Sequence, residues 1–206
     1  KIADRISDAL LDEILKQDPH ARTGIETVAG ANRVALYGEI NTTAKIDFES
    51  VVRSTIKELG YTNPDWGFSH ESVFENNVHE QSPEIAQGTN DDTGAGDQGM
   101  MFGFAINETP ELMPLPIAIA HSLTRRLDEV REKQILSYIR PDGKSQVTVQ
   151  YEDGKPVGIE TVVIATAHDE QTDEATVRSG IFNEVVTPVL GKYGYTITDD
   201  QLIVNG

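Results

Sequence analysis

The segment around Lys144 has residue types suited to binding a polyanion. Residues 140–145 read Arg-Pro-Asp-Gly-Lys-Ser and lead into an alternating β-type run, so Asp142, Gly143 and Lys144 are expected on a tight turn at the end of a sheet. An ammonium group placed there can act as a point charge on a polyphosphate. An ordinary Asp-Gly turn followed by a solvated lysine fits the same residues, so the pattern alone leaves both interpretations open.

A second candidate is the glycine-rich run GAGDQG at residues 94–99. Its glycines allow positive φ angles at three places around Asp97, so the loop can present this carboxylate to a cation or a ribose. A plain turn into the following residues is an equal alternative. The pattern GxxxxGK[ST] does not occur in the chain, so the run is not a phosphate-binding loop of that kind.

Two carboxylates, Glu26 and Glu39, lie in β-type runs that are otherwise uncharged apart from Arg33 at the start of the second run. Strand carboxylates without basic neighbours suggest a cation or an amine as ligand, and a solvent-facing position is the alternative. The histidines are scattered, and none pairs with another at metal-ligand spacing, so we assign them no role. They are His20, His70, His79, His121 and His168.

The elements that must position these residues follow one order twice. The first half predicts a helix over residues 2–15 and a hairpin of residues 23–28 and 33–40, which flank Gly30-Ala31-Asn32. A helix over 48–59 and a strand over 72–78 follow. Asp47 is placed to cap the second helix and Gly60 to end it. The second half predicts a strand over 100–106, a helix over 116–130 and a hairpin of 145–151 and 157–167 with a turn at Asp153-Gly154. A helix over 174–190 ended by Gly191 and a strand over 201–204 follow.

This order predicts an α+β fold of repeated helix-hairpin-helix-strand units, with small mixed sheets each covered on one face by helices. We expect an N-terminal domain at residues 1–81, a mobile loop at 82–93 and a second domain at 94–206. The apolar residues Met100, Met101, Phe102 and Phe104 are expected in the core of a sheet. The uncovered sheet faces must be buried against each other or a partner, so we expect an oligomer.

The bulk composition restricts the partners of the chain. A formal charge of −17 on 206 residues makes nonspecific binding to nucleic acid or to anionic lipid unfavourable, so neither is expected as a partner. No apolar run approaches the roughly 20 residues that span a bilayer. The absence of cysteine excludes a thiol nucleophile and a disulfide framework, and we expect a cytoplasmic protein.

Eight short segments occur in a specific order: KIADRISDALLDEIL, ARTGIETV, YGEINTTA, QSPEIAQG, GAGDQG, GFAINET, LMPLPI and RPDGKSQV. In this order, over nearly all 206 residues, the chain resembles the methionine adenosyltransferase, or S-adenosylmethionine synthetase, family. The resemblance implies that the sulfur of L-methionine attacks the ribose C5′ of ATP. The triphosphate leaves and is hydrolysed to phosphate and diphosphate.

The resemblance also implies roles for single residues. Glu39 in YGEI and Gln81 in QSPEI match methionine-binding positions, and Gln81 begins the mobile active-site loop of the family. Asp97 matches a contact to methionine and adenosine.

The resemblance also implies which residues bind the nucleotide and the metal ions. Asp142, Gly143 and Lys144 match the ATP-binding segment, with Lys144 as the charge on the phosphates, so we expect Lys144 and Asp97 to be catalytic. Glu26 in GIET matches a carboxylate ligand of a potassium site. The implied cofactors are Mg²⁺ and K⁺, and the implied assembly is a homodimer or homotetramer with active sites between subunits.

The resemblance is incomplete at both ends. The family carries His-Pro-Asp directly before the position of Lys1, and a glycine-rich segment and a third repeat after Gly206. We therefore expect the intact parent to be a synthetase and the 206 residues alone to be inactive. The alternative is a noncatalytic homologue that keeps the fold as a nucleotide-binding or regulatory partner.

Overall fold

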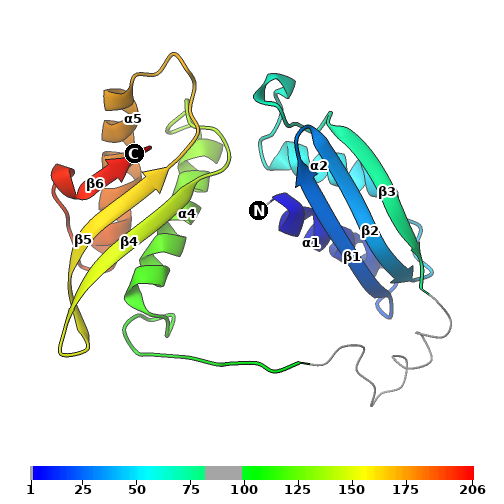
Figure 1. Cartoon of the computed structure of the whole chain (residues 1–206), viewed down its shortest axis with the longest axis horizontal. Coiled ribbons are helices and arrows are strands. Elements are labelled where there is room, and N and C mark those ends of the chain that lie inside the picture. Colours follow the sequence, from blue (N-terminus) through cyan, green and yellow to red (C-terminus); the bar gives the residue numbers. More distant parts are fainter. Residues whose placement is uncertain (1, 82–98) are drawn as a thin grey trace. The chain divides into compact units, whose positions relative to one another are not determined.

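A computed structural model describes residues 2–81 and 99–206 of the chain. The chain divides into two compact units, Lys1–Met101 and Phe102–Gly206. Each unit is described by itself below, and Figure 1 labels the strands and most of the helices of both. The expected mobile loop at 82–93 and the whole GAGDQG run except Gly99 lie outside the described residues, so the expected domain limits stay predictions.

The first unit is one mixed sheet with helices on one of its faces (Figure 1). Strand β2 is central: it pairs antiparallel with β1 and parallel with β3, because helix α2 crosses over between β2 and β3. The elements are α1 (Ile2–Gln17), β1 (Arg22–Gly30), β2 (Arg33–Asn41), α2 (Phe48–Glu58), a 3-10 turn (Pro64–Trp66) and β3 (Val73–Glu80).

The core of this unit lies between the helices and the inner face of the sheet. It contains Ile6, Leu10, Val34, Leu36 and Ile56, all buried. The predicted ends of α2 are confirmed: the Asp47 carboxylate accepts a hydrogen bond from the Ser50 N–H, and Gly60 follows with φ +92°. Because the helices cover only one face, the other face of the sheet is open within this unit.

The second unit repeats the same order of elements. It contains α4 (Leu115–Glu132), β4 (Lys144–Glu152), β5 (Lys155–Ala165), α5 (Glu174–Ile181), a π-helical turn (Phe182–Val186), α6 (Thr187–Lys192), a 3-10 turn (Asp199–Gln201) and β6 (Leu202–Val204). Strand β5 is central, antiparallel to β4 and parallel to β6. The predicted turn at Asp153-Gly154 is confirmed, because both residues have the positive φ that a two-residue hairpin turn requires.

The single helix expected over residues 174–190 is wrong in its middle and at its end. Pro188 has no N–H for the carbonyl four residues earlier, that of Glu184, and its ring crowds the same oxygen. The helix widens into the π turn, in which the Thr187 N–H donates to the Phe182 carbonyl. The helix also continues through Gly191, and the chain turns only at Gly194, whose φ is +80°.

The strand expected over residues 100–106 is also wrong. These residues form no regular element, and Met100, Met101, Phe102 and Phe104 are between 74% and 92% exposed rather than in a core. A strand forms only by hydrogen bonding to another strand, and none of the described strands pairs with this segment. The predicted α+β class itself is confirmed, as two small mixed three-stranded sheets packed against helices.

Candidate functional site

The open face of the first sheet carries both strand carboxylates. In the β1–β2 pairing Gly24 lies opposite Glu39, and Glu26 lies opposite Tyr37. Side chains alternate between faces along a strand, so all four positions point away from α1 and α2. The sheet therefore brings Glu26 and Glu39 together, as diagonal neighbours on one surface.

Two glycines shape this surface in different ways. A Cβ at Gly38 would lie 1.9 Å from the carbonyl oxygen of Gly24, and the φ of Gly38 is +125°, so β1 and β2 approach closely only because residue 38 is glycine. A Cβ at Gly24 would meet only the Glu39 carbonyl oxygen, at 3.9 Å, which is ordinary contact. The fold therefore has room for a side chain at residue 24, and the glycine leaves the space beside Glu39 free.

On its other side Glu39 meets a histidine from β3. The parallel pairing of β2 with β3 sets His79 beside Glu39, and His79 Nε2 lies 3.4 Å from Glu39 Oε1. Sequence reasoning assigned His79 no role, because only the register between two strands separated by a helix brings the residues together. A proton on Nε2, present in the imidazolium and in one neutral tautomer, would face the carboxylate.

Gln81 lies at the end of β3 and is held to β2 through its main chain. Its N–H donates to the Ile40 carbonyl at 3.0 Å. Its side-chain Oε1 is buried and accepts no hydrogen bond from the described residues. The side chain of Gln81, the residue that directly follows β3, is thus an unsatisfied hydrogen-bond acceptor. The same strand carries His79. Asp97, the third residue expected to contact methionine, lies outside the described residues.

The nucleotide candidates Asp142, Gly143 and Lys144 lie together in the second unit, where they lead into β4. Asp142 has φ +80°, and a Cβ at Gly143 would lie 2.8 Å from Leu127 Cδ1, so the main chain packs tightly on α4. Lys144 is exposed, and no described side chain forms an ion pair or a hydrogen bond with its ammonium group. A lysine without a partner in a fixed turn is available to an anionic ligand.

Contacts on both sides fix this turn. Before it, the Arg140 N–H donates to the Ala167 carbonyl at 2.8 Å, and Arg140 Nε lies 3.1 Å from Asp169 Oδ1. After it, the Ser145 hydroxyl donates to the Ala120 carbonyl of α4 at 2.8 Å. The conformation of the turn is therefore set by the fold.

The described residues do not form a metal site by themselves. Among them no group of three or more histidine and carboxylate side chains is arranged to hold a metal ion. Glu26 has no ion pair within the described part, so it can offer a carboxylate to K⁺, but as a single ligand. The donor set for Mg²⁺ is not assembled by residues 2–81 and 99–206.

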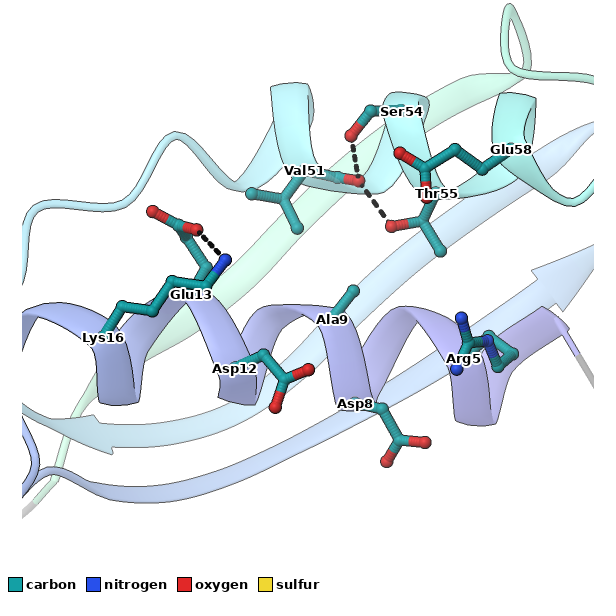
Figure 2. A pocket seen from close by; sticks show the side chains of 10 residues that line it. All are labelled: Arg5, Asp8, Ala9, Asp12, Glu13, Lys16, Val51, Ser54, Thr55 and Glu58. Atoms are coloured by element: carbon teal, nitrogen blue, oxygen red, sulfur yellow. Dashed lines mark hydrogen bonds and ion pairs between the residues drawn. The ribbon is translucent and has the colours of Figure 1, made fainter.

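A surface groove of about 280 Å³ runs between α1 and α2 (Figure 2). Its walls are mostly charged: Arg5, Asp8, Asp12, Glu13, Lys16 and Glu58. At its base the Thr55 hydroxyl is already satisfied by the Val51 carbonyl, at 2.8 Å. None of the residues predicted to bind substrate or metal lines this groove, so we do not place the site there. No described helix is long and apolar enough to cross a membrane.

Comparison with known proteins gives a consistent result for both units. Residues 1–83 match the family model described as S-adenosylmethionine synthetase, N-terminal domain, and residues 92–206 match the one described as its central domain. The S-adenosylmethionine synthase of Nostoc punctiforme is 51% identical in an alignment 214 residues long. The alignment covers 93% of this chain and 50% of the relative. That of Acaryochloris marina is 50% identical, covering 92% and 50%. The chain spans about half the length of the curated relatives that it matches.

Proposed function

The chain belongs to the S-adenosylmethionine synthetase family, and from this premise we propose that it carries substrate-binding residues of a methionine adenosyltransferase. The reaction forms S-adenosylmethionine from ATP and L-methionine and releases phosphate and diphosphate. The observation that carries the proposal is the pair of carboxylates, Glu26 and Glu39, on one open sheet face with free space at Gly24.

The chemistry of methionine suits this face. Methionine brings an ammonium group, and the product adds a sulfonium cation beside it, so carboxylates belong on the methionine side. We assign Glu39, Gln81 and Asp97 to methionine and Glu26 to potassium. The buried Oε1 of Gln81 supports its assignment, because an acceptor without a donor gains from a ligand N–H.

The chemistry of ATP suits the turn before β4. The leaving triphosphate is a polyanion, so positive charge that is in place before the C–O bond breaks lowers the barrier. We assign this role to Lys144, with Asp142 and Gly143 forming the wall of the nucleotide site. The formal charge of −17 makes a local positive group necessary, because the surface as a whole repels the triphosphate.

The attacking atom needs no activation by the protein. A thioether sulfur is neutral and has no proton to lose, so the reaction requires neither a general base nor an activated nucleophile. The sulfur forms a bond to C5′ as the C5′–O bond breaks, and the electron pair leaves with the triphosphate. The chain therefore acts by positioning the two substrates and by stabilising charge.

The remaining parts of the proposal rest on the family. Mg²⁺ and K⁺ are the expected cofactors, and a homodimer or homotetramer with active sites between subunits is the expected assembly. The open sheet face in each unit supports an assembly, because apolar side chains on it, such as Val28, Tyr37 and Ile203, are exposed. We further propose a cytoplasmic location and no activity for these 206 residues alone.

Release of phosphate and diphosphate from ATP tests the proposal. The assay compares this chain with a version extended to the length of its curated relatives, with and without methionine, Mg²⁺ and K⁺. We expect turnover only by the extended protein, and only with methionine. Turnover by this chain alone would contradict its expected inactivity. No turnover by a folded, oligomeric extended protein would instead favour the noncatalytic, nucleotide-binding alternative.

A further inference from the structure

His79 is the one titratable side chain in direct polar contact with Glu39 among the described residues. Its Nε2 lies 3.4 Å from Glu39 Oε1, and the two residues are paired in register across β2 and β3. The Glu39 side chain is 34% exposed and that of His79 is 66% exposed, so both are open to a ligand.

The rest of the surface leaves the Glu39 carboxylate otherwise unrestrained. On the β1 side its neighbour is Gly24, which has no side chain to hold it. The diagonal neighbour of Glu39 on β1, Arg22, forms no ion pair with it among the described residues. No other hydrogen bond or ion pair to the Glu39 carboxylate occurs within the described part of the chain. The contact with His79 is therefore the only polar contact of the Glu39 carboxylate among the described residues.

We propose that His79 is a positioning residue, which holds the Glu39 carboxylate in the orientation that receives the ammonium group of methionine. The inference rests on the proposed function, since it takes Glu39 as a methionine-binding residue. A long carboxylate side chain must otherwise be ordered when the ligand binds, and this ordering weakens binding. An imidazole that orders it beforehand strengthens methionine binding and leaves ATP binding unaffected.

Steady-state kinetics of the enzyme extended to the length of its relatives test this role. The variants are His79→Ala, His79→Gln and His79→Asn, with His20→Ala as a control in an exposed turn of the same unit. Glutamine places an amide N–H near the position of imidazole Nε2, whereas the shorter asparagine places it near Nδ1. Glutamine should therefore rescue the contact and asparagine should not.

We expect the KM for methionine to rise about fivefold in His79→Ala, the upper range for one exposed ion pair. The KM for ATP and the thermal unfolding midpoint should stay unchanged. His79→Gln should recover most of the loss, and His79→Asn little of it. In a Glu39→Ala background the His79→Ala change should have no further effect, because the group that it positions is gone.

The failures of the inference and of the proposed function are distinguishable. An active enzyme whose methionine KM is the same in His79→Ala overturns the inference alone. Equal effects of His79→Ala in the presence and absence of the Glu39 carboxylate do the same. An unsubstituted extended enzyme without methionine-dependent turnover contradicts the proposed function itself, and the inference falls with it.

Discussion

The main chain of Gly38 lies against the carbonyl oxygen of Gly24, so closely that a Cβ at Gly38 would stand 1.9 Å from that oxygen. Gly38 pairs with Ile25, and Gly24 pairs with Glu39, so this close approach lies one residue before Glu39 on β2. The close approach fixes the position from which the Glu39 side chain leaves the sheet. Only one of the two glycines is required by the backbone, and this difference can be measured.

Gly38→Ala should destabilise this chain by about 3 kcal/mol or more, because the residue has φ +125° and meets backbone rather than a movable side chain. Gly24→Ala should change the free energy of unfolding by no more than about 1 kcal/mol, since its Cβ has room. Urea denaturation of the two variants measures the difference. Equal losses would show that the two strands do not approach as described.

Arg126 should stabilise the helix that Pro188 interrupts. Arg126 Nε donates to the Glu184 carbonyl at 2.8 Å, the oxygen that Pro188 leaves without its usual donor. Arg126→Met should cost about 1 to 2 kcal/mol, because this acceptor loses its partner. In a Pro188→Ala background the cost should shrink, since the new N–H can take over. A double-mutant cycle by chemical denaturation measures the coupling, and strict additivity would contradict it.

Asp18 should make the first unit sensitive to acid. Hydrogen bonds from the Thr43 N–H, the Thr42 hydroxyl and further donors lower the pKa of Asp18 to about 2. A group whose folded pKa lies below its unfolded value of about 3.9 stabilises the fold above that value. This contribution is lost as the pH falls from about 4 towards about 2.

The Asp18→Asn variant tests this assignment. It should be less stable than the parent at neutral pH, and the two should converge as the pH falls, because the lost interaction needs an ionised carboxylate. Thermal unfolding followed by circular dichroism from pH 2 to pH 7 measures the convergence. A constant difference over this range would assign the effect to hydrogen bonding that does not depend on charge.

Local signals predicted most of the elements correctly. Asp47 as a cap, the Ala31-Asn32 and Asp153-Gly154 turns and Gly60 after α2 each depend on a few neighbouring residues, and the structure confirms them. The π turn has a local cause as well, since Pro188 stands inside the helical pattern and leaves the Glu184 carbonyl without its usual donor.

The pairing of strands that lie far apart in the sequence could not be predicted from local residue patterns. The β-type residues at 100–104 predict a strand, but whether a strand forms depends on an edge elsewhere in the chain or assembly. The neighbourhood of His79 and Glu39 depends in the same way on the parallel register of β2 and β3, which α2 separates in sequence. The order of motifs predicts the site residues, and the register adds the neighbour that we propose to position one of them.

The proposed assignments of Glu39 to methionine and of Lys144 to ATP are tested most directly by a pair of neutralising substitutions, Glu39→Gln and Lys144→Met, in the extended enzyme. Neither should disturb the fold, since both side chains are partly or fully exposed and Lys144 has no partner within the described residues. Lys155→Met, at the exposed start of β5, is the matched control for Lys144.

The measurement is the KM of each substrate, with turnover followed by phosphate release. We expect Glu39→Gln to raise the KM for methionine about tenfold or more with little change for ATP, because it removes the anion that receives the ammonium group. Lys144→Met should instead lower kcat/KM for ATP by about tenfold or more, and Lys155→Met should do neither. The two assignments are contradicted if each substitution affects the kinetics of both substrates equally. They are also contradicted if neither substitution affects either substrate.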